Sequence, residues 1–129
     1  MVRFCDEFKA LSVIAPNDGA SAAVTATVDA VPVGAASVDF VVAFASEAAI
    51  TPKVTVNGYD GSAYKEIKAH TFAAKNADNT YVVSVECVPA YGKYQLKVEG
   101  SGAGTFAVAA SAVWRVMYAD GAINDAVRA

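Results

Sequence analysis

The fold of this chain is decided by one central stretch, which reads Lys53-Val54-Thr55-Val56-Asn57-Gly58-Tyr59-Asp60-Gly61-Ser62-Ala63-Tyr64-Lys65-Glu66-Ile67-Lys68. Val54 and Val56 fall on one face of an extended segment and polar residues fall on the other, as a half-buried strand requires. The Asp60-Gly61 pair then supplies the positive backbone φ of a tight turn. The extended pattern resumes from Ala63 to Lys68, so the stretch predicts a β-hairpin.

The same period of two recurs on both sides of this hairpin. Further strands are predicted at Ala23 to Val33, Ser37 to Ala45, Tyr81 to Cys87, Lys93 to Glu99 and Thr105 to Tyr118. Turns or loops are predicted at Asp18-Gly19, Asp78-Asn79, Gly100 to Gly104 and Asp120-Gly121. Helix signals are limited to a single turn at Ser46 to Ala49. About seven or eight short strands predict an all-β antiparallel β-sandwich, and the pattern leaves jelly-roll and Greek-key connectivity both open.

The last predicted strand is long and rich in small residues. One parity holds Phe106, Val108, Ala110, Ala112 and Trp114, with Trp114 expected to anchor the core. The other parity holds Ala107, Ala109, Ser111 and Val113. Two close-packed faces would explain these small side chains, and so would a subunit interface on the outer face.

Length and composition indicate one ordered domain. The chain has 129 residues, of which 55% are hydrophobic and 18% charged, and these values exclude a largely disordered protein. We expect a single domain over residues 1–129, with short arms at residues 1–6 and 119–129. The net charge of -3 and the pI near 5.0 argue against binding to nucleic acid or to an anionic membrane.

Segments for membrane insertion or export are not expected either. The most apolar stretch, Val38 to Ile50, is interrupted by Asp39 and Glu47, and it is shorter than the roughly 20 residues of a membrane span. Asp6 and Glu7 interrupt the N-terminal region where a secretion signal needs an apolar run. Without export, Cys5 and Cys87 are expected to stay reduced.

Residues that could carry catalysis are few. His70 is the single histidine, so any triad or histidine metal site would depend on it, and a surface position at a strand end is the simpler interpretation. Two acid pairs, Asp6 with Glu7 and Asp60 with Glu66, could in principle serve glycoside hydrolysis. Asp60 is better explained as a turn residue and Glu66 as a solvated strand residue. The sequence therefore predicts no enzyme, no cofactor and no metal.

Tyrosines offer a different kind of site. Tyr59, Tyr64, Tyr91 and Tyr94 could form a platform that stacks on the apolar faces of sugar rings. Such tyrosines more often belong to a core or an interface, with the hydroxyl at the rim.

A resemblance to a known family is carried by Val54 to Ile67, Tyr81 to Val85, Gly92 to Val98 and the alanine-rich closing strand. These segments, within Ala35 to Met117, resemble small β-sandwich capsid decoration (cement) proteins of tailed bacteriophages. In such chains a Val-x-Val strand leads to an Asp-Gly turn and an aromatic residue. A Lys-Tyr-x-x-Lys-Val strand and a strand of small residues then close the sheet.

The resemblance implies a viral structural protein, made in the host cytoplasm, that sits on the virion surface and bridges subunits of the major capsid protein. It also implies self-association, for which we expect a homotrimer ahead of a homodimer. The arms contribute the candidate contact residues Val2, Phe4, Ile123 and Val127. Alternative functions are a carbohydrate-binding module and a phage tail or head-fibre component.

Overall fold

A computed structural model describes residues 8–20, 23–28, 31, 35–46, 49–73, 79–102 and 104–116. All regular elements in these ranges are strands, as expected for the all-β class. Their bounds are β1 Phe8–Ala20, β2 Val24–Val28, β3 Ala35–Ala45, β4 Thr51–Tyr59, β5 Tyr64–Thr71, β6 Asn79–Glu86, β7 Lys93–Ser101 and β8 Phe106–Val116. Within the described ranges, no helix has the length and apolar character needed to cross a membrane.

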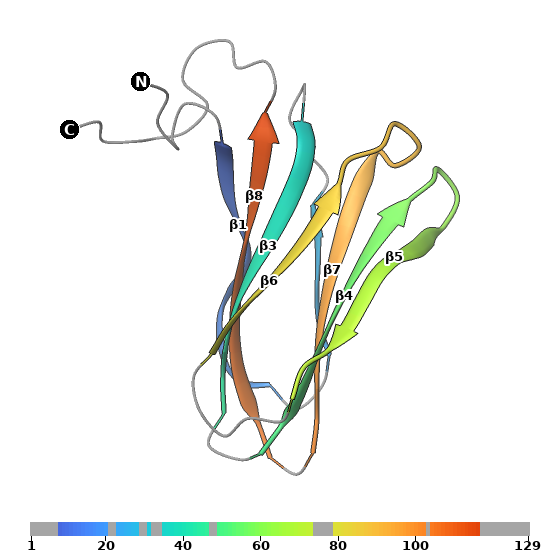
Figure 1. Cartoon of the computed structure of the whole chain (residues 1–129). Helices are drawn as coiled ribbons and strands as arrows, with labels where there is room; N and C mark the ends of the chain where they lie inside the picture. Colours follow the sequence, from blue (N-terminus) through green and yellow to red (C-terminus); the bar gives the residue numbers. More distant parts are fainter. Residues whose placement is uncertain are drawn as a thin grey trace, which may run out of the picture.

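The strands form two antiparallel sheets that face each other (Figure 1). The first sheet has the order β1-β8-β3-β6 and the second has the order β2-β7-β4-β5. The pairs β1·β8, β2·β7, β3·β6 and β4·β5 are nested, as if one long hairpin of paired strands were rolled up. This nesting is the connectivity of a jelly roll, so the structure resolves the choice that the sequence leaves open.

The core lies between the sheets and follows the predicted alternation. Tyr94, Leu96 and Val98 of β7 are 0% exposed, and the even-numbered residues of β8 from Phe106 to Val116 are all buried. Trp114 is buried near the end of β8, with its ring centroid 5.8 Å from that of Tyr94. The interpretation of Trp114 as a core anchor is therefore confirmed.

Aromatic rings continue the core at the opposite end of the sandwich. Phe44 stacks on Phe106 with centroids 4.9 Å apart, and Tyr81 stacks on Phe72 at 4.0 Å. Phe44 and Tyr81 meet edge to face at 6.4 Å, which joins the two stacks. Three of these rings come from the first sheet and Phe72 directly follows β5 of the second, so ring contacts join the two sheets at this end.

The structure contains one strand that the sequence did not predict, and several boundaries differ from the prediction. The first strand, β1, was not predicted at all, and Asp18-Gly19, expected to form a turn, lies inside it. Register shifts between β1 and β8 explain both errors, because extra residues destroy a simple alternation. The predicted loop at Gly100 begins later, since β7 continues to Ser101. Gly100 remains necessary there, because an added Cβ would lie 2.7 Å from Ile50 and 2.8 Å from Phe106.

Candidate functional site

The candidate catalytic residue His70 lies on β5, an edge strand whose residues are all exposed. Its ring meets Phe72 edge to face at 4.6 Å, and its partner across the strand is Val54. Among the described residues, no group of three or more histidine, cysteine or acidic side chains could hold a metal ion. His70 is thus placed as a surface residue at a strand end, as its sequence context suggested.

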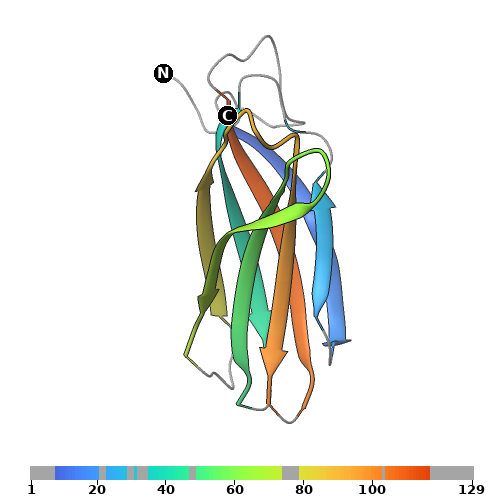
Figure 2. The ribbon, with the colours of Figure 1, turned by 90° about the vertical axis from the view of Figure 1, so that its right-hand side faces the viewer.

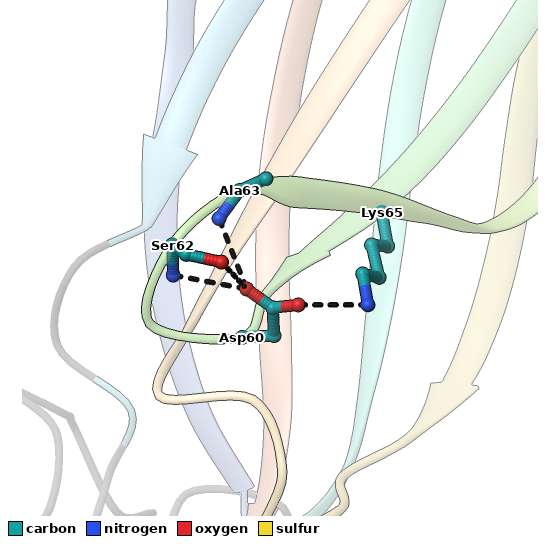
Figure 3. A network of polar contacts seen from close by, with 4 residues as sticks. All are labelled: Asp60, Ser62, Ala63 and Lys65. Atoms are coloured by element: carbon teal, nitrogen blue, oxygen red, sulfur yellow. Dashed lines mark hydrogen bonds and ion pairs between the residues drawn. The ribbon is translucent and has the colours of Figure 1, made fainter.

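Of the acid pair Asp60 and Glu66, Asp60 lies in the β4–β5 turn (Figure 3), and Glu66 is an exposed residue of β5. Asp60 Oδ1 accepts hydrogen bonds from Ser62 N at 2.9 Å, Ser62 Oγ at 3.0 Å and Ala63 N at 2.9 Å. Asp60 Oδ2 pairs with Lys65 Nζ at 2.9 Å. Gly61 has φ +102°, as the Asp-Gly turn requires.

Electrostatics at this turn keep Asp60 ionised. The Lys65 hydrogen bond, assisted by the bonds from Ala63 and Ser62, holds the pKa of the Asp60 carboxyl well below its ordinary value. The same contact raises the pKa of Lys65. An acid held in this way is a poor proton donor, so it is unsuited to the role of general acid. Asp60 is a structural residue of the turn, in agreement with the simpler interpretation of the sequence.

The four candidate tyrosines do not form one platform. Tyr94 is 0% exposed, its hydroxyl accepts a hydrogen bond from Val88 N at 3.2 Å, and burial raises its pKa. Tyr59 and Tyr64 face each other across the β4–β5 hairpin with centroids 5.0 Å apart and planes tilted by 48°. Tyr91, from the β6–β7 loop, packs over Gly58. The four-tyrosine platform is not formed, and Tyr94 takes the core position that is the commoner role of such tyrosines.

Tyr59 and Tyr64 lie at one end of the second sheet, whereas Tyr91 packs against the core there, with its ring centroid 6.2 Å from that of Tyr94. Lys93 Nζ lies 4.6 Å from the centroid of the Tyr59 ring, a cation–π contact. Gly92 N donates to Tyr59 O at 3.3 Å, which ties the β6–β7 loop to β4. Tyr64 is 36% exposed, so this end presents one accessible ring beside a lysine.

The outer face of the second sheet is polar. Outward-facing residues on its central strands are Lys53, Thr55, Asn57 and Tyr59 on β4 and Lys93, Gln95, Lys97 and Glu99 on β7. Asn57 Nδ2 donates to Gln95 Oε1 at 3.1 Å, and Lys97 Nζ lies 3.6 Å from Glu99 Oε1. Figure 2 turns this sheet toward the viewer, with β2 and β5 at its two edges.

The outer face of the first sheet has a different character. Small or β-branched side chains lie next to one another across all four strands, a surface that we call the small-residue face. Its members are Ala10 and Ser12 on β1, Ala107, Ala109, Ser111 and Val113 on β8, Val41 and Ala43 on β3, and Thr80, Val82 and Ser84 on β6. One row runs from Ser12 through Ser111 and Val41 to Val82, which is 56% exposed.

Charge on the small-residue face is confined to a few positions. Asp39 lies within it, while Arg115 and Glu86 lie in one row at its end. The sequence indicated the β8 part of this surface. It did not indicate the contributions of β1, β3 and β6, because strand neighbours cannot be read from one alternating pattern.

Other predicted contact residues are not tested by the structure. Val2, Phe4, Ile123 and Val127 lie outside the described residues, as does Cys5. Cys87 is a half-buried free thiol whose pKa is raised by burial.

Comparison with known proteins gives structural likeness only. The sequence matches no protein family and no curated protein. The chain is similar to a chain in the structure of infectious bursal disease virus Gx strain, with 12% identity, a TM-score of 0.52 and 87% of this chain covered. This chain spans about a third of the length of that viral chain (33%). A chain from Bacillus endospore appendages, described as disulfide-linked pili, is similar at 12% identity with a TM-score of 0.41, covering 88% of this chain and 94% of that one. The viral likeness shows a shared fold.

Proposed function

We propose that this chain is a non-enzymatic structural protein that binds the outer surface of a tailed-phage capsid and stabilises it by bridging capsid subunits. The observation that carries the proposal is the small-residue face of the first sheet. It is broad, because small or β-branched side chains from all four strands contribute to it, and the row from Ser12 to Val82 crosses the whole sheet. A monomer has no evident use for such a face, whereas a flat protein surface can pack closely against it.

Side-chain entropy favours this face over the other sheet for tight contact. Alanine, serine and valine lose little rotamer freedom when they become buried, whereas each lysine of the second sheet would lose up to about 2 kcal/mol. The polar face, with Lys53, Lys93 and Lys97, therefore suits contact with solvent. In the proposed arrangement the first sheet faces the capsid and the second sheet faces outward.

The shared fold supports a viral structural role, and the sequence resemblance supports the narrower role on a tailed-phage capsid. Jelly rolls are recurrent domains of viral capsids, and the chain shares its fold with the viral structure described above. Fold alone does not assign function, so the tailed-phage role depends on the family resemblance of residues 35–117. The proposed partners are the major capsid protein and further copies of this chain, because several linked copies multiply weak contacts through effective concentration.

Co-sedimentation with shells of the phage whose genome encodes this chain tests the proposal. We expect saturable binding and a higher temperature of shell rupture in its presence, through linkage between binding and stability. Ala43→Lys on the exposed centre of the small-residue face should weaken binding at least about tenfold, because it desolvates a charge in the contact. Thr27→Lys adds the same charge to an exposed position of the second sheet and should bind as wild type does. Equal weakening by both variants, or no binding by the wild type, would exclude this docking face.

A carbohydrate-binding function is the second candidate. It is favoured by the exposed ring of Tyr64 next to Tyr59 and Lys93, since jelly rolls also serve as lectin domains. Glycan-array binding that is lost in Tyr64→Ala, and retained in Ala43→Lys, would assign the function to this end of the second sheet.

A further inference from the structure

The two sheets are open, so four strands lie at sheet edges: β1 and β6 in the first sheet, β2 and β5 in the second. An edge strand presents backbone N–H and C=O groups that can pair with another strand. Natural proteins usually protect such edges with bulges, short length, proline or lysine. The four edges of this chain differ sharply in that protection.

Three of the edges carry recognisable protection. β1 has three register shifts against β8 and contains Pro16. β2 is five residues long. β5 has a register shift at Ile67 and carries Lys65 and Lys68. Strand addition at any of these edges would meet an irregular, short or charged backbone.

The fourth edge, β6, has none of these features. It stays in unbroken register with β3 over eight residue pairs, from Asn79 opposite Phe44 to Glu86 opposite Ser37. It contains no proline, lysine or arginine. Tyr81, Val83 and Val85 are buried on its inner side, while Thr80, Val82 and Ser84 are exposed on its outer side. A regular edge with an exposed valine at its centre is a template for another strand.

We infer that β6 is a self-pairing edge: two copies of this chain join through antiparallel β6 strands across a two-fold axis. The two first sheets then form one continuous sheet, and the interface is isologous, with the same residues contributed by each copy. Residues directly opposite each other in a sheet share a face, so the axis passes through a residue, Val82 or Val83, and not between residues.

The charge of Glu86 favours antiparallel over parallel pairing of two β6 strands. Glu86 is the single charged side chain of β6. A parallel arrangement would place Glu86 opposite Glu86 of the other copy, and like charges directly opposite are destabilising. Antiparallel pairing centred on Val83 separates the two carboxylates by about 20 Å, at about 3.4 Å per residue. On the outer side, Val82 then lies opposite Ser84 of the other copy and Glu86 lies opposite Thr80, so no two charges face each other.

Edge pairing also has a consequence for the small-residue face. The faces of the two copies become adjacent and continuous through Val82 and Val41, which doubles the surface available for docking. The inference departs from the trimer expected from the sequence, because edge pairing joins two copies. It does not depend on capsid binding, so its test in solution is independent of the proposed function.

The test is the solution mass of the purified chain, measured by light scattering after size exclusion and by sedimentation. We expect twice the mass of one chain for the wild type, and at least about a tenfold larger dimer dissociation constant for Val82→Lys. Thr27→Lys, with the same added charge on the exposed outer side of β2, should remain dimeric. Thermal unfolding of each variant shows whether a change of mass comes from lost pairing or from lost structure.

Cross-linking locates the interface independently of the lysine variants. In a Cys5→Ser, Cys87→Ser background, Val82→Cys should form a covalent dimer with a short bismaleimide, and Thr25→Cys on β2 should not. Amide exchange in residues 79–86 should also slow as protein concentration rises. A monomeric wild type, a trimer, open-ended filaments, or a dimer that is unaffected by Val82→Lys would each overturn the inference.

Discussion

Gly58 lies against the ring of Tyr91 so closely that a Cβ at residue 58 would be 2.5 Å from Tyr91 Cγ and 2.6 Å from Tyr91 Cδ1. The absence of a side chain on β4 is what lets the β6–β7 loop fold down onto the second sheet. The hydrogen bond from Gly92 N to Tyr59 O fastens the same loop to the end of β4. The geometry of the tyrosine-rich end therefore depends on a residue that carries no functional group.

Gly58→Ala is expected to lower the free energy of unfolding by about 1–3 kcal/mol, because the added Cβ would clash with Cγ and Cδ1 of Tyr91 and the ring would have to move. Gly92→Ala is the matched control, since a Cβ at residue 92 has no neighbour within 4 Å, and it should change stability by less than about 0.5 kcal/mol. Urea unfolding of both variants measures the difference. In a double variant, Tyr91→Ala should recover part of the loss, and strict additivity would show that the two residues do not interact.

Tyr94→Phe tests the buried hydroxyl that accepts a hydrogen bond from Val88 N. We expect a loss of about 0.5–1.5 kcal/mol at neutral pH. Because burial raises the pKa of Tyr94 in the folded state, folding favours the protonated phenol. Its contribution is complete below the ordinary tyrosine pKa of about 10 and is lost as pH rises through the folded value.

The dependence of stability on pH in the alkaline range therefore tests the burial of the Tyr94 phenol. Unfolding midpoints measured between about pH 9 and 11 should fall less steeply in Tyr94→Phe than in wild type. An unchanged slope in Tyr94→Phe would mean that this phenol is not shielded from solvent.

Cys87 should react slowly with thiol reagents in the folded protein. Its thiol is half-buried and its pKa is raised by burial, so less of the reactive thiolate is present near neutral pH. In a Cys5→Ser background, alkylation at about pH 8 should be at least about tenfold slower than for a free thiol, and denaturant should remove the protection. Alkylation at the same rate with and without denaturant would contradict this placement of Cys87.

The Asp60 turn can be tested by measuring a single pKa. Carboxyl chemical shifts followed through an acid titration should give Asp60 a pKa well below its ordinary value. Lys65→Gln removes the hydrogen bond that lowers the pKa of Asp60 most, and should therefore raise that pKa. Glu66→Gln should leave the pKa of Asp60 nearly unchanged. Because the folded value is lowered, the contribution of Asp60 to stability is present above its ordinary pKa and is lost as pH falls below it.

Much of the fold could be predicted from local pattern because most strands of this sandwich have one buried and one solvated side. Trp114 was assigned to the core from the alternation of the last strand, and the Asp60-Gly61 turn from its residue pair. β1 was missed because its register shifts break that alternation. Local pattern also assigns strands without their neighbours, so jelly-roll pairing was beyond the reach of the sequence.

The same limit explains the outcome for the candidate sites. Tyr94 was grouped with Tyr59, Tyr64 and Tyr91 by residue type, whereas its parity on β7 directs it into the core. The small-residue face requires knowing that Ser12, Ser111, Val41 and Val82 share one row, which depends on long-range register. Edge protection likewise depends on strand order, because the sequence of a strand does not show whether that strand lies at an edge or in the middle of a sheet.

Trp114 supplies a probe for all of these variants, because it is the one tryptophan of the chain and is 0% exposed. Its Nε1 is buried without a hydrogen-bond partner among the described residues. We therefore expect blue-shifted emission in the folded state, weak quenching by acrylamide, and a red shift on unfolding. Val82→Lys should change the solution mass and leave this emission unaltered, because Val82 points away from the core that holds Trp114. A red shift in that variant at neutral pH would mean that the substitution disrupts the sandwich itself, and Val82→Cys cross-linking would then decide the pairing of β6.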